Sequence, residues 1–141
     1  MKTTPAVAIT FLIWISLMTG QIVFLFILFN GEPRDGCKSM AETFAMLSGS
    51  SATMSFVMRH LLFRGFRSGK LTLDTTEGQA SYITGHVVLF ALSEVVGVLG
   101  FVNGIGCASK HEWLPFIGAA IVLLVVHIPL PSRFRPQNIR L

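Results

Sequence analysis

Four long stretches of this sequence carry almost no charged side chains. No Asp, Glu, Lys or Arg occurs in residues 3–31, 43–58 or 113–132, and residues 78–109 contain only Glu94. A helix needs about 20 predominantly apolar residues to cross the hydrocarbon core of a bilayer. The gaps therefore predict four transmembrane helices, over residues 6–29, 41–62, 81–102 and 114–130.

The composition supports an all-α, polytopic membrane protein with one domain. Charged residues make up 13% of the chain and hydrophobic residues 52%, whereas a soluble domain carries about 25% charged residues. The remaining polar residues are too few to cover a globule of this size in water. The lipid bilayer is therefore the first expected partner.

The N-terminal span has a competing interpretation. Lys2 precedes an apolar run, as it would in a secretory signal peptide. The apolar region of such a signal is only about 7 to 15 residues long and ends in a small-x-small cleavage site, which is missing near residues 18–21. We therefore expect a retained span.

The second span is the least apolar of the four. Its centre reads Ser48-Gly49-Ser50-Ser51, and small residues recur at every fourth position, at Ala41, Ala45, Gly49 and Thr53. Small residues let two membrane helices approach closely. This stripe predicts a helix contact, either within the monomer or between copies.

Lys and Arg are divided unevenly between the two ends of the predicted bundle. Eight lie on one side (Lys2, Arg59, Arg64, Arg67, Lys70, Arg133, Arg135 and Arg140), and three on the other (Arg34, Lys38 and Lys110). The positive-inside rule then places both termini and the basic loop 59–80 in the cytoplasm, for a multi-pass protein of the inner (plasma) membrane. Phe residues between the basic residues of this loop also suit a segment lying on anionic headgroups. No nucleic acid partner is needed to explain the basic charge.

Each of the two outward loops contains one cysteine, Cys37 or Cys107, and the chain has no other. In an oxidising exterior the two could form a disulfide that closes one end of the bundle. Two unpaired thiols are the equally weighted alternative.

The regions around the two cysteines resemble each other. A shift of 73 residues superposes Asn30-Gly31 on Asn103-Gly104 and carries Gln21 onto Glu94. The similarity indicates an internal duplication. It predicts two similar helical hairpins, related by an axis near the membrane normal.

Glu94 is the strongest candidate for a functional residue. It lies twelve residues past Tyr82, about 18 Å along a helix and so within the hydrocarbon region. A charged group there costs at least about 2.5 to 3.5 kcal/mol, and such residues are functional candidates by default. Glu94, with Gln21 and Ser93 as neighbours, is the predicted ion-binding set. The alternative is a hydrogen bond from Gln21 to Glu94 that only joins two helices.

Three histidines, His60, His86 and His127, are predicted near the cytoplasmic end of the bundle. Imidazoles there could bind a metal or relay protons. His86 is eight residues from Glu94, about 12 Å along the helix, so the two cannot form one site. No His-x-x-x-His or Cys-x-x-Cys spacing occurs. We expect neither a metal nor a cofactor.

Residues 90–102, with the sequence FALSEVVGVLGFV, resemble the carboxylate-bearing helix of the c-type proteolipids of rotary ATPases. Their pattern is Ala-Leu-x-Glu followed by an apolar stretch with glycine. This resemblance implies that Glu94 is an ion-carrying carboxylate. The second span departs from the pattern, because it has Gly49 alone where the family has a ladder of glycines. The chain is also similar to small uncharacterised bacterial four-helix membrane proteins with Gly-Gln in span one and Leu-x-Glu in span three.

Two functions follow from these observations. The first is a proton- or cation-binding membrane subunit, acting as a homo-oligomer or beside a partner in a membrane complex. The second is a structural or accessory four-helix subunit without transport activity. An enzyme is not expected, because the sequence shows no nucleophile beside a base and no phosphate-binding loop. A dimeric exporter is a weaker idea, since such exporters carry their glutamate in the first span.

Overall fold

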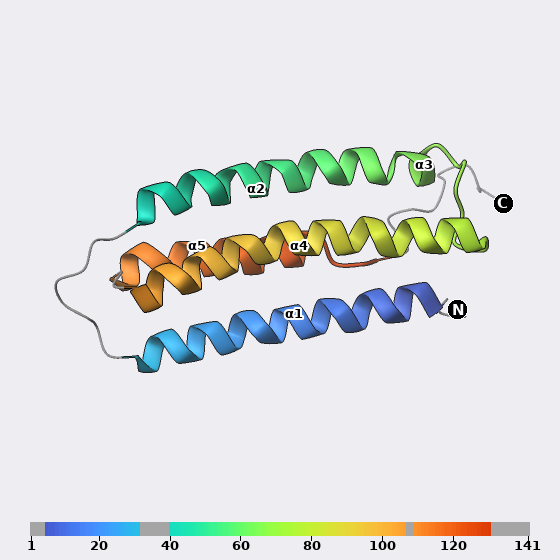
Figure 1. The fold of residues 1–141 in the computed structure, drawn as a ribbon. Helices are drawn as coiled ribbons and strands as arrows, with labels where there is room; N and C mark the ends of the chain where they lie inside the picture. The colour runs from blue at the N-terminus through green and yellow to red at the C-terminus, as the bar shows by residue number, and fades with distance from the viewer. Residues whose placement is uncertain (1–4, 32–39, 107–108, 131–141) are drawn as a thin grey trace.

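The computed structural model describes residues 5–31, 40–106 and 109–130. These residues form five helices and no strand, which confirms the predicted all-helical fold. The helices are α1 (Pro5–Asn30), α2 (Ala41–Leu62), α3 (Arg64–Arg67), α4 (Thr76–Gly106) and α5 (Lys110–Val126). The four long helices lie side by side along one axis, and the short α3 follows α2 at one end (Figure 1).

Helix α4 lies at the centre of the bundle. It contacts α5, α2 and α1, whereas α1 and α2 make few contacts with each other and lie on opposite sides of it (Figure 1). Helices α4 and α5 therefore pack as a hairpin, but α1 and α2 do not. The two halves of the chain are packed differently, although their helices occupy similar ranges under the 73-residue shift.

Among the described residues, two helices, α1 and α4, are long and apolar enough by length and composition to cross a membrane. The predicted limits of the first two spans agree with the structure within one residue, since α2 covers 41–62 and α1 covers 5–30. Helix α4 is longer at both ends than the predicted 81–102. At its start the Thr75 hydroxyl accepts a hydrogen bond from the Gly78 amide (3.1 Å), and a cap of this kind stabilises a helix end in water.

Helix α5 covers Lys110–Val126, so it begins and ends four residues before the predicted fourth span, 114–130. The Glu112 carboxylate accepts a hydrogen bond from the Ser109 amide (2.8 Å). This cap begins the helix before the apolar run. The helix ends early because Pro129 lacks an amide hydrogen and disfavours helical backbone at the preceding residue, Ile128.

The last carbonyl groups of α5 accept hydrogen bonds from side chains of two other helices and of His127, which follows α5. The Trp14 indole of α1 donates to the Leu124 carbonyl (2.8 Å), and the Arg59 guanidinium of α2 donates to the Val126 carbonyl (3.1 Å). The Leu123 carbonyl accepts from the amide and from the Nδ1 of His127. Helix ends otherwise leave these carbonyls unsatisfied. The end of α5 is therefore pinned to α1 and α2.

The basic loop after α2 is folded against the bundle. Phe63 and Phe66 are buried in a cluster with Ala6, Tyr82 and Leu89, so these rings point inward and do not insert among lipid headgroups as a flat-lying segment would. The Arg67 guanidinium donates to the His60 carbonyl (2.8 Å). Gly69 adopts a φ of 73°, which favours glycine. The loop is thus an ordered turn that anchors α2 to α4.

Glycines on α4 allow its neighbours to approach closely. A Cβ placed on Gly100 would lie 2.5 Å from the Cβ of Phe116 on α5, and one on Gly104 would lie 2.7 Å from the side chain of Leu28 on α1. The absence of side chains at these positions lets both helices pack directly on the α4 backbone. This close packing explains the central place of α4.

Candidate functional site

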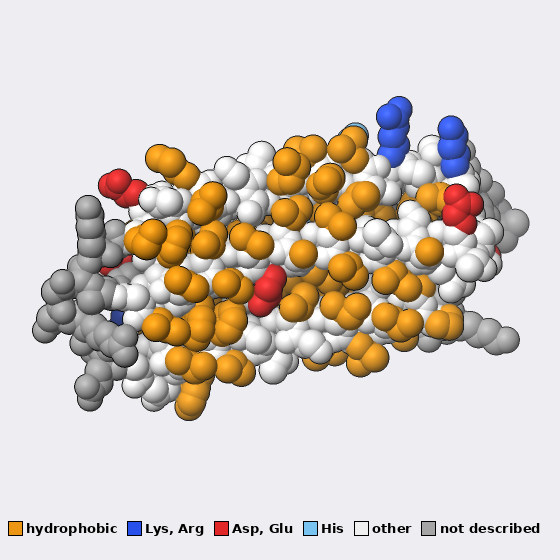
Figure 2. All heavy atoms as spheres, in the orientation of Figure 1, with side chains coloured by type: hydrophobic (Ala, Val, Ile, Leu, Met, Phe, Trp, Pro, Cys, Tyr) orange, Lys and Arg blue, Asp and Glu red, His pale blue; other side chains and the backbone are white. Residues whose placement is uncertain are grey.

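Glu94 lies near the middle of α4, about 27 Å from the start of the helix and about 18 Å from its end. Its side chain is half-buried. Charged side chains gather at both ends of the bundle in Figure 2, and the long face between them is mostly apolar. Glu94 is the only charged residue between Glu77 and Lys110 in the sequence. Its carboxyl group is therefore isolated from other charges on its own helix.

The side chain beside Glu94 is Gln21 of α1, which is completely buried. The Gln21 amide lies directly on the backbone of Gly97, since a Cβ on Gly97 would come within 2.6 Å of the amide carbon. A Cβ on the adjacent Gly20 would lie 4.0 Å from Oε1 of Glu94. Gly97 thus makes the space for the Gln21 amide, and Gly20 lies at ordinary contact distance from the Glu94 carboxyl group.

The two polar groups are neighbours, but their hydrogen bond is not well formed. The Glu94 carboxyl group and the Gln21 amide are within hydrogen-bonding reach of each other. Neither amide atom of Gln21 has a hydrogen-bond partner among the described residues, however, and the buried Oε2 of Glu94 has none there either. Buried amides are almost always hydrogen-bonded in folded proteins. The site is therefore a buried polar site with unused hydrogen-bonding capacity.

Ser93 does not complete this site. It is fully buried, and its hydroxyl donates to the Leu89 carbonyl of its own helix (2.9 Å). Residues one apart on a helix point about 100° from each other, so Ser93 and Glu94 face different neighbours. The structure brings together Glu94 and Gln21 and leaves Ser93 on another face of α4.

The three histidines serve separate contacts. His86 is buried and its Nδ1 lies 3.0 Å from the Tyr82 carbonyl. His127 is also buried, with its Nδ1 2.8 Å from the Leu123 carbonyl. His60 is exposed at the end of α2 and lies beside Arg67. Within the described residues, no group of three His, Cys, Asp or Glu side chains is placed to hold a metal ion.

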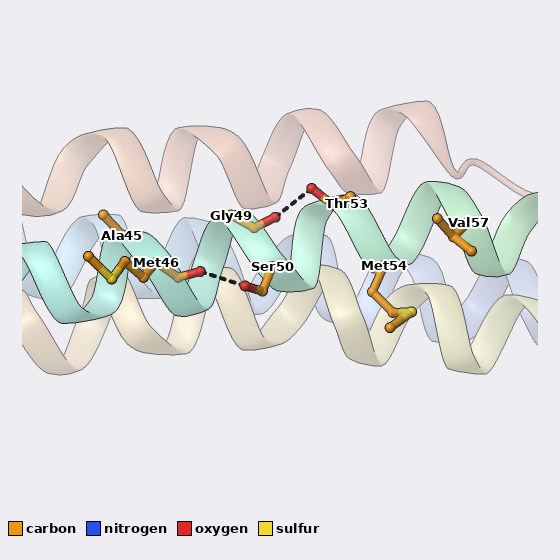
Figure 3. A pocket seen from close by; sticks show the side chains of 7 residues that line it. All are labelled: Ala45, Met46, Gly49, Ser50, Thr53, Met54 and Val57. Carbon is orange, nitrogen blue, oxygen red and sulfur yellow. Dashed lines mark hydrogen bonds between the residues drawn. The ribbon is translucent and has the colours of Figure 1, made fainter.

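The small-residue stripe of α2 does not pack inside the monomer. Ala45, Gly49 and Thr53 are exposed and line a shallow groove whose walls all come from α2 (Figure 3). The Thr53 hydroxyl donates to the Gly49 carbonyl of the same helix (2.9 Å). Helix α2 contacts the rest of the bundle through another face, which includes Ser48 and Ser55. Of the two alternatives for the stripe, the contact within the monomer is therefore wrong.

Sequence reasoning missed two parts of this arrangement. The close approach of the Gln21 amide to the backbone of Gly97 was not expected. The links of Trp14 and Arg59 to α5 were also unexpected, because hydrogen bonds to carbonyls of a distant helix leave no sequence pattern. Cys37 and Cys107 lie outside the described residues, so their pairing stays a prediction.

Comparisons of the chain with models of protein families, with curated proteins and with solved structures find no match. The functional argument therefore depends on the geometry of this chain alone.

Proposed function

We propose that the chain is an integral membrane protein whose four long helices all cross the bilayer. The main support is the distribution of polarity in α1. Its four buried residues include Thr10 and Gln21, whereas large apolar side chains such as Leu12 and Phe26 are 65% and 69% exposed. A helix of a water-soluble bundle has the opposite pattern, with its apolar face buried. Lipid is the solvent that suits this surface.

Of the four proposed transmembrane helices, α2 and α5 have the weaker support. Helix α5 has 17 residues, about 25 Å of helix, somewhat less than the roughly 30 Å of the hydrocarbon core. In lipid, the last carbonyl groups of α5 would lack hydrogen-bond donors, which costs free energy. Trp14 and Arg59 supply two of these donors. These contacts support a position of α5 within the membrane.

The orientation follows from the charges at the two ends of the bundle. Among the described residues, four basic side chains lie in or next to α3 (Arg59, Arg64, Arg67 and Lys70). The opposite end contains one, Lys110. By the positive-inside rule, we place the α3 end and both termini in the cytoplasm, in the inner (plasma) membrane.

We further propose that Glu94 binds a proton or a cation within the membrane. The observation that carries this proposal is the completely buried Gln21 amide, which has no hydrogen-bond partner among the described residues and lies beside the only acid of the α4 centre. A buried polar pair of this kind is costly unless something occupies it. A bound proton or cation would satisfy these groups.

The alternative is a structural or accessory subunit in which Glu94 and Gln21 only hold α4 against α1. The Glu94 carboxyl group is half-buried, and the Gln21 amide is within hydrogen-bonding reach of it. A small side-chain rotation would therefore complete a hydrogen bond between the two groups. The open groove along α2 favours association with another membrane helix, either in a homo-oligomer or in a larger complex. Neither version is an enzyme.

The test is covalent labelling of Glu94 with an apolar carbodiimide, which reacts with a protonated carboxyl group in a membrane. The adduct is located by mass spectrometry of the native protein in liposomes. We expect labelling at Glu94 that becomes faster as the pH falls, because protonation precedes the reaction.

Glu94→Gln is the matched control, since it keeps the shape of the side chain and removes the reactive acid. It should abolish the adduct and leave the size of the detergent-solubilised particle unchanged. Absence of labelling in the wild-type protein across mildly acidic to mildly alkaline pH would favour the structural alternative.

A further inference from the structure

The oxygen atoms around Glu94 are too few to replace the hydration shell of an alkali cation. Membrane proteins that bind such ions surround them with backbone carbonyls, supplied by carbonyl rings or by unwound helix segments. Here both helices are continuous through the site, from Pro5 to Asn30 and from Thr76 to Gly106, so their carbonyls are engaged within the helices. The ligands left are the two carboxyl oxygens of Glu94 and the amide oxygen of Gln21.

The nearest hydroxyls in the sequence do not face this pair. Thr19, two residues before Gln21, is exposed, and Ser93 is buried on another face of α4. Within the described residues, the pair of Glu94 and Gln21 therefore offers three oxygens. An alkali cation held there would keep most of its water, in a site formed by two closely packed helices.

A proton, in contrast, matches the hydrogen-bonding capacity of the site. A neutral carboxyl group has one O–H donor and one carbonyl acceptor, and a primary amide has an acceptor and two donors. The two groups can therefore form a reciprocal pair that uses both unpartnered ends of Gln21. An alkali cation would be bound only by the oxygens of the pair, whereas a neutral carboxyl group uses both the amide oxygen and an amide N–H.

We infer that the site formed by Glu94 and Gln21 takes a proton and excludes alkali cations. This inference rests on the proposed function and specifies its ligand. The reaction is the reversible addition of a proton to the Glu94 carboxylate, with no other group transferred.

The experiment compares carbodiimide labelling of the intact wild-type protein in liposomes at one fixed pH in four media. These contain sodium, lithium, potassium or choline chloride at equal ionic strength, and choline is the control because it is too large for the site. We expect the same labelling rate at Glu94 in all four media. A rate slowed several-fold by any of the three alkali cations relative to choline would overturn the inference while leaving the proposed ion-binding function intact.

A different result would overturn the proposed ion-binding function itself. If Glu94 is unlabelled in every medium, including choline at low pH, the proposed function is lost and this inference with it. The exposed acids Glu42 and Glu77, labelled by a water-soluble carbodiimide, show in the same sample that the reagent chemistry works.

Discussion

The contact between Gly97 and Gln21 allows a sharp test of the packing between α1 and α4. In Gly97→Ala, the new Cβ would lie 2.5 Å from Nε2 and 2.6 Å from Cδ of Gln21, whereas unstrained contacts of this kind are at about 3.5 to 4.0 Å. The amide must therefore move by roughly 1 Å, or the two helices must separate. Because Gln21 is completely buried, neither adjustment has free space beside it.

The expected magnitude combines two opposing effects. Overpacking of a tight core costs about 1 to 3 kcal/mol. Replacement of glycine by alanine inside a helix returns up to about 1 kcal/mol through helix propensity. The matched control is Gly118→Ala on α5, where a Cβ meets no atom within 4 Å. We therefore expect Gly97→Ala to be less stable than Gly118→Ala by about 1 to 3 kcal/mol.

The assay is thermal unfolding of each purified variant in the same detergent, followed by the loss of helical circular dichroism. Gly118→Ala should unfold at or above the wild-type temperature and Gly97→Ala clearly below it. Truncation of the amide in the double variant Gly97→Ala with Gln21→Ala should recover part of the loss, because the clash is removed. Equal unfolding temperatures for the two single variants would refute the placement of Gln21 on Gly97.

Two further predictions concern the carbonyl end of α5. Arg59→Gln should lower the stability by about 1 to 3 kcal/mol, since it weakens the bond to the partly buried Val126 carbonyl. The matched control Arg64→Gln, at an exposed position, should leave the unfolding temperature unchanged; equal effects would contradict this role. Trp14→Phe should cost about 1 kcal/mol because the Leu124 carbonyl loses its indole donor, and increased hydrogen exchange in the last turn of α5 would locate the loss.

The helices themselves were largely predictable from the sequence. The predicted spans 41–62 and 6–29 coincide with α2 and, within one residue at each end, with α1. The offset at α5 arose because the helix limits depend on a cap at Ser109 and on Pro129, which the pattern of charge-free gaps does not include. Long apolar runs have few alternative conformations, so their helical state is a local property of the chain.

The neighbours of each helix were not predictable in the same way. The 73-residue shift superposes Gln21 on Glu94, but residues at equivalent positions of a repeat need not be in contact. In the structure Gln21 lies against Gly97, three residues further along α4, and reaches Glu94 from there. The small-residue stripe at Gly49 was predicted to be a helix contact, and the monomer leaves it open.

Hydropathy and charge are properties of individual residues. They were sufficient to predict an all-helical chain and to single out Glu94 as its isolated acid. The partners of that acid are a property of how α1 sits on α4. That arrangement depends on Gly97, which removes a side chain from the interface and lets an amide of α1 lie beside a carboxyl group of α4. Close approach is decided by the shapes of both helices together, and so only the tertiary structure places Gln21 beside Glu94.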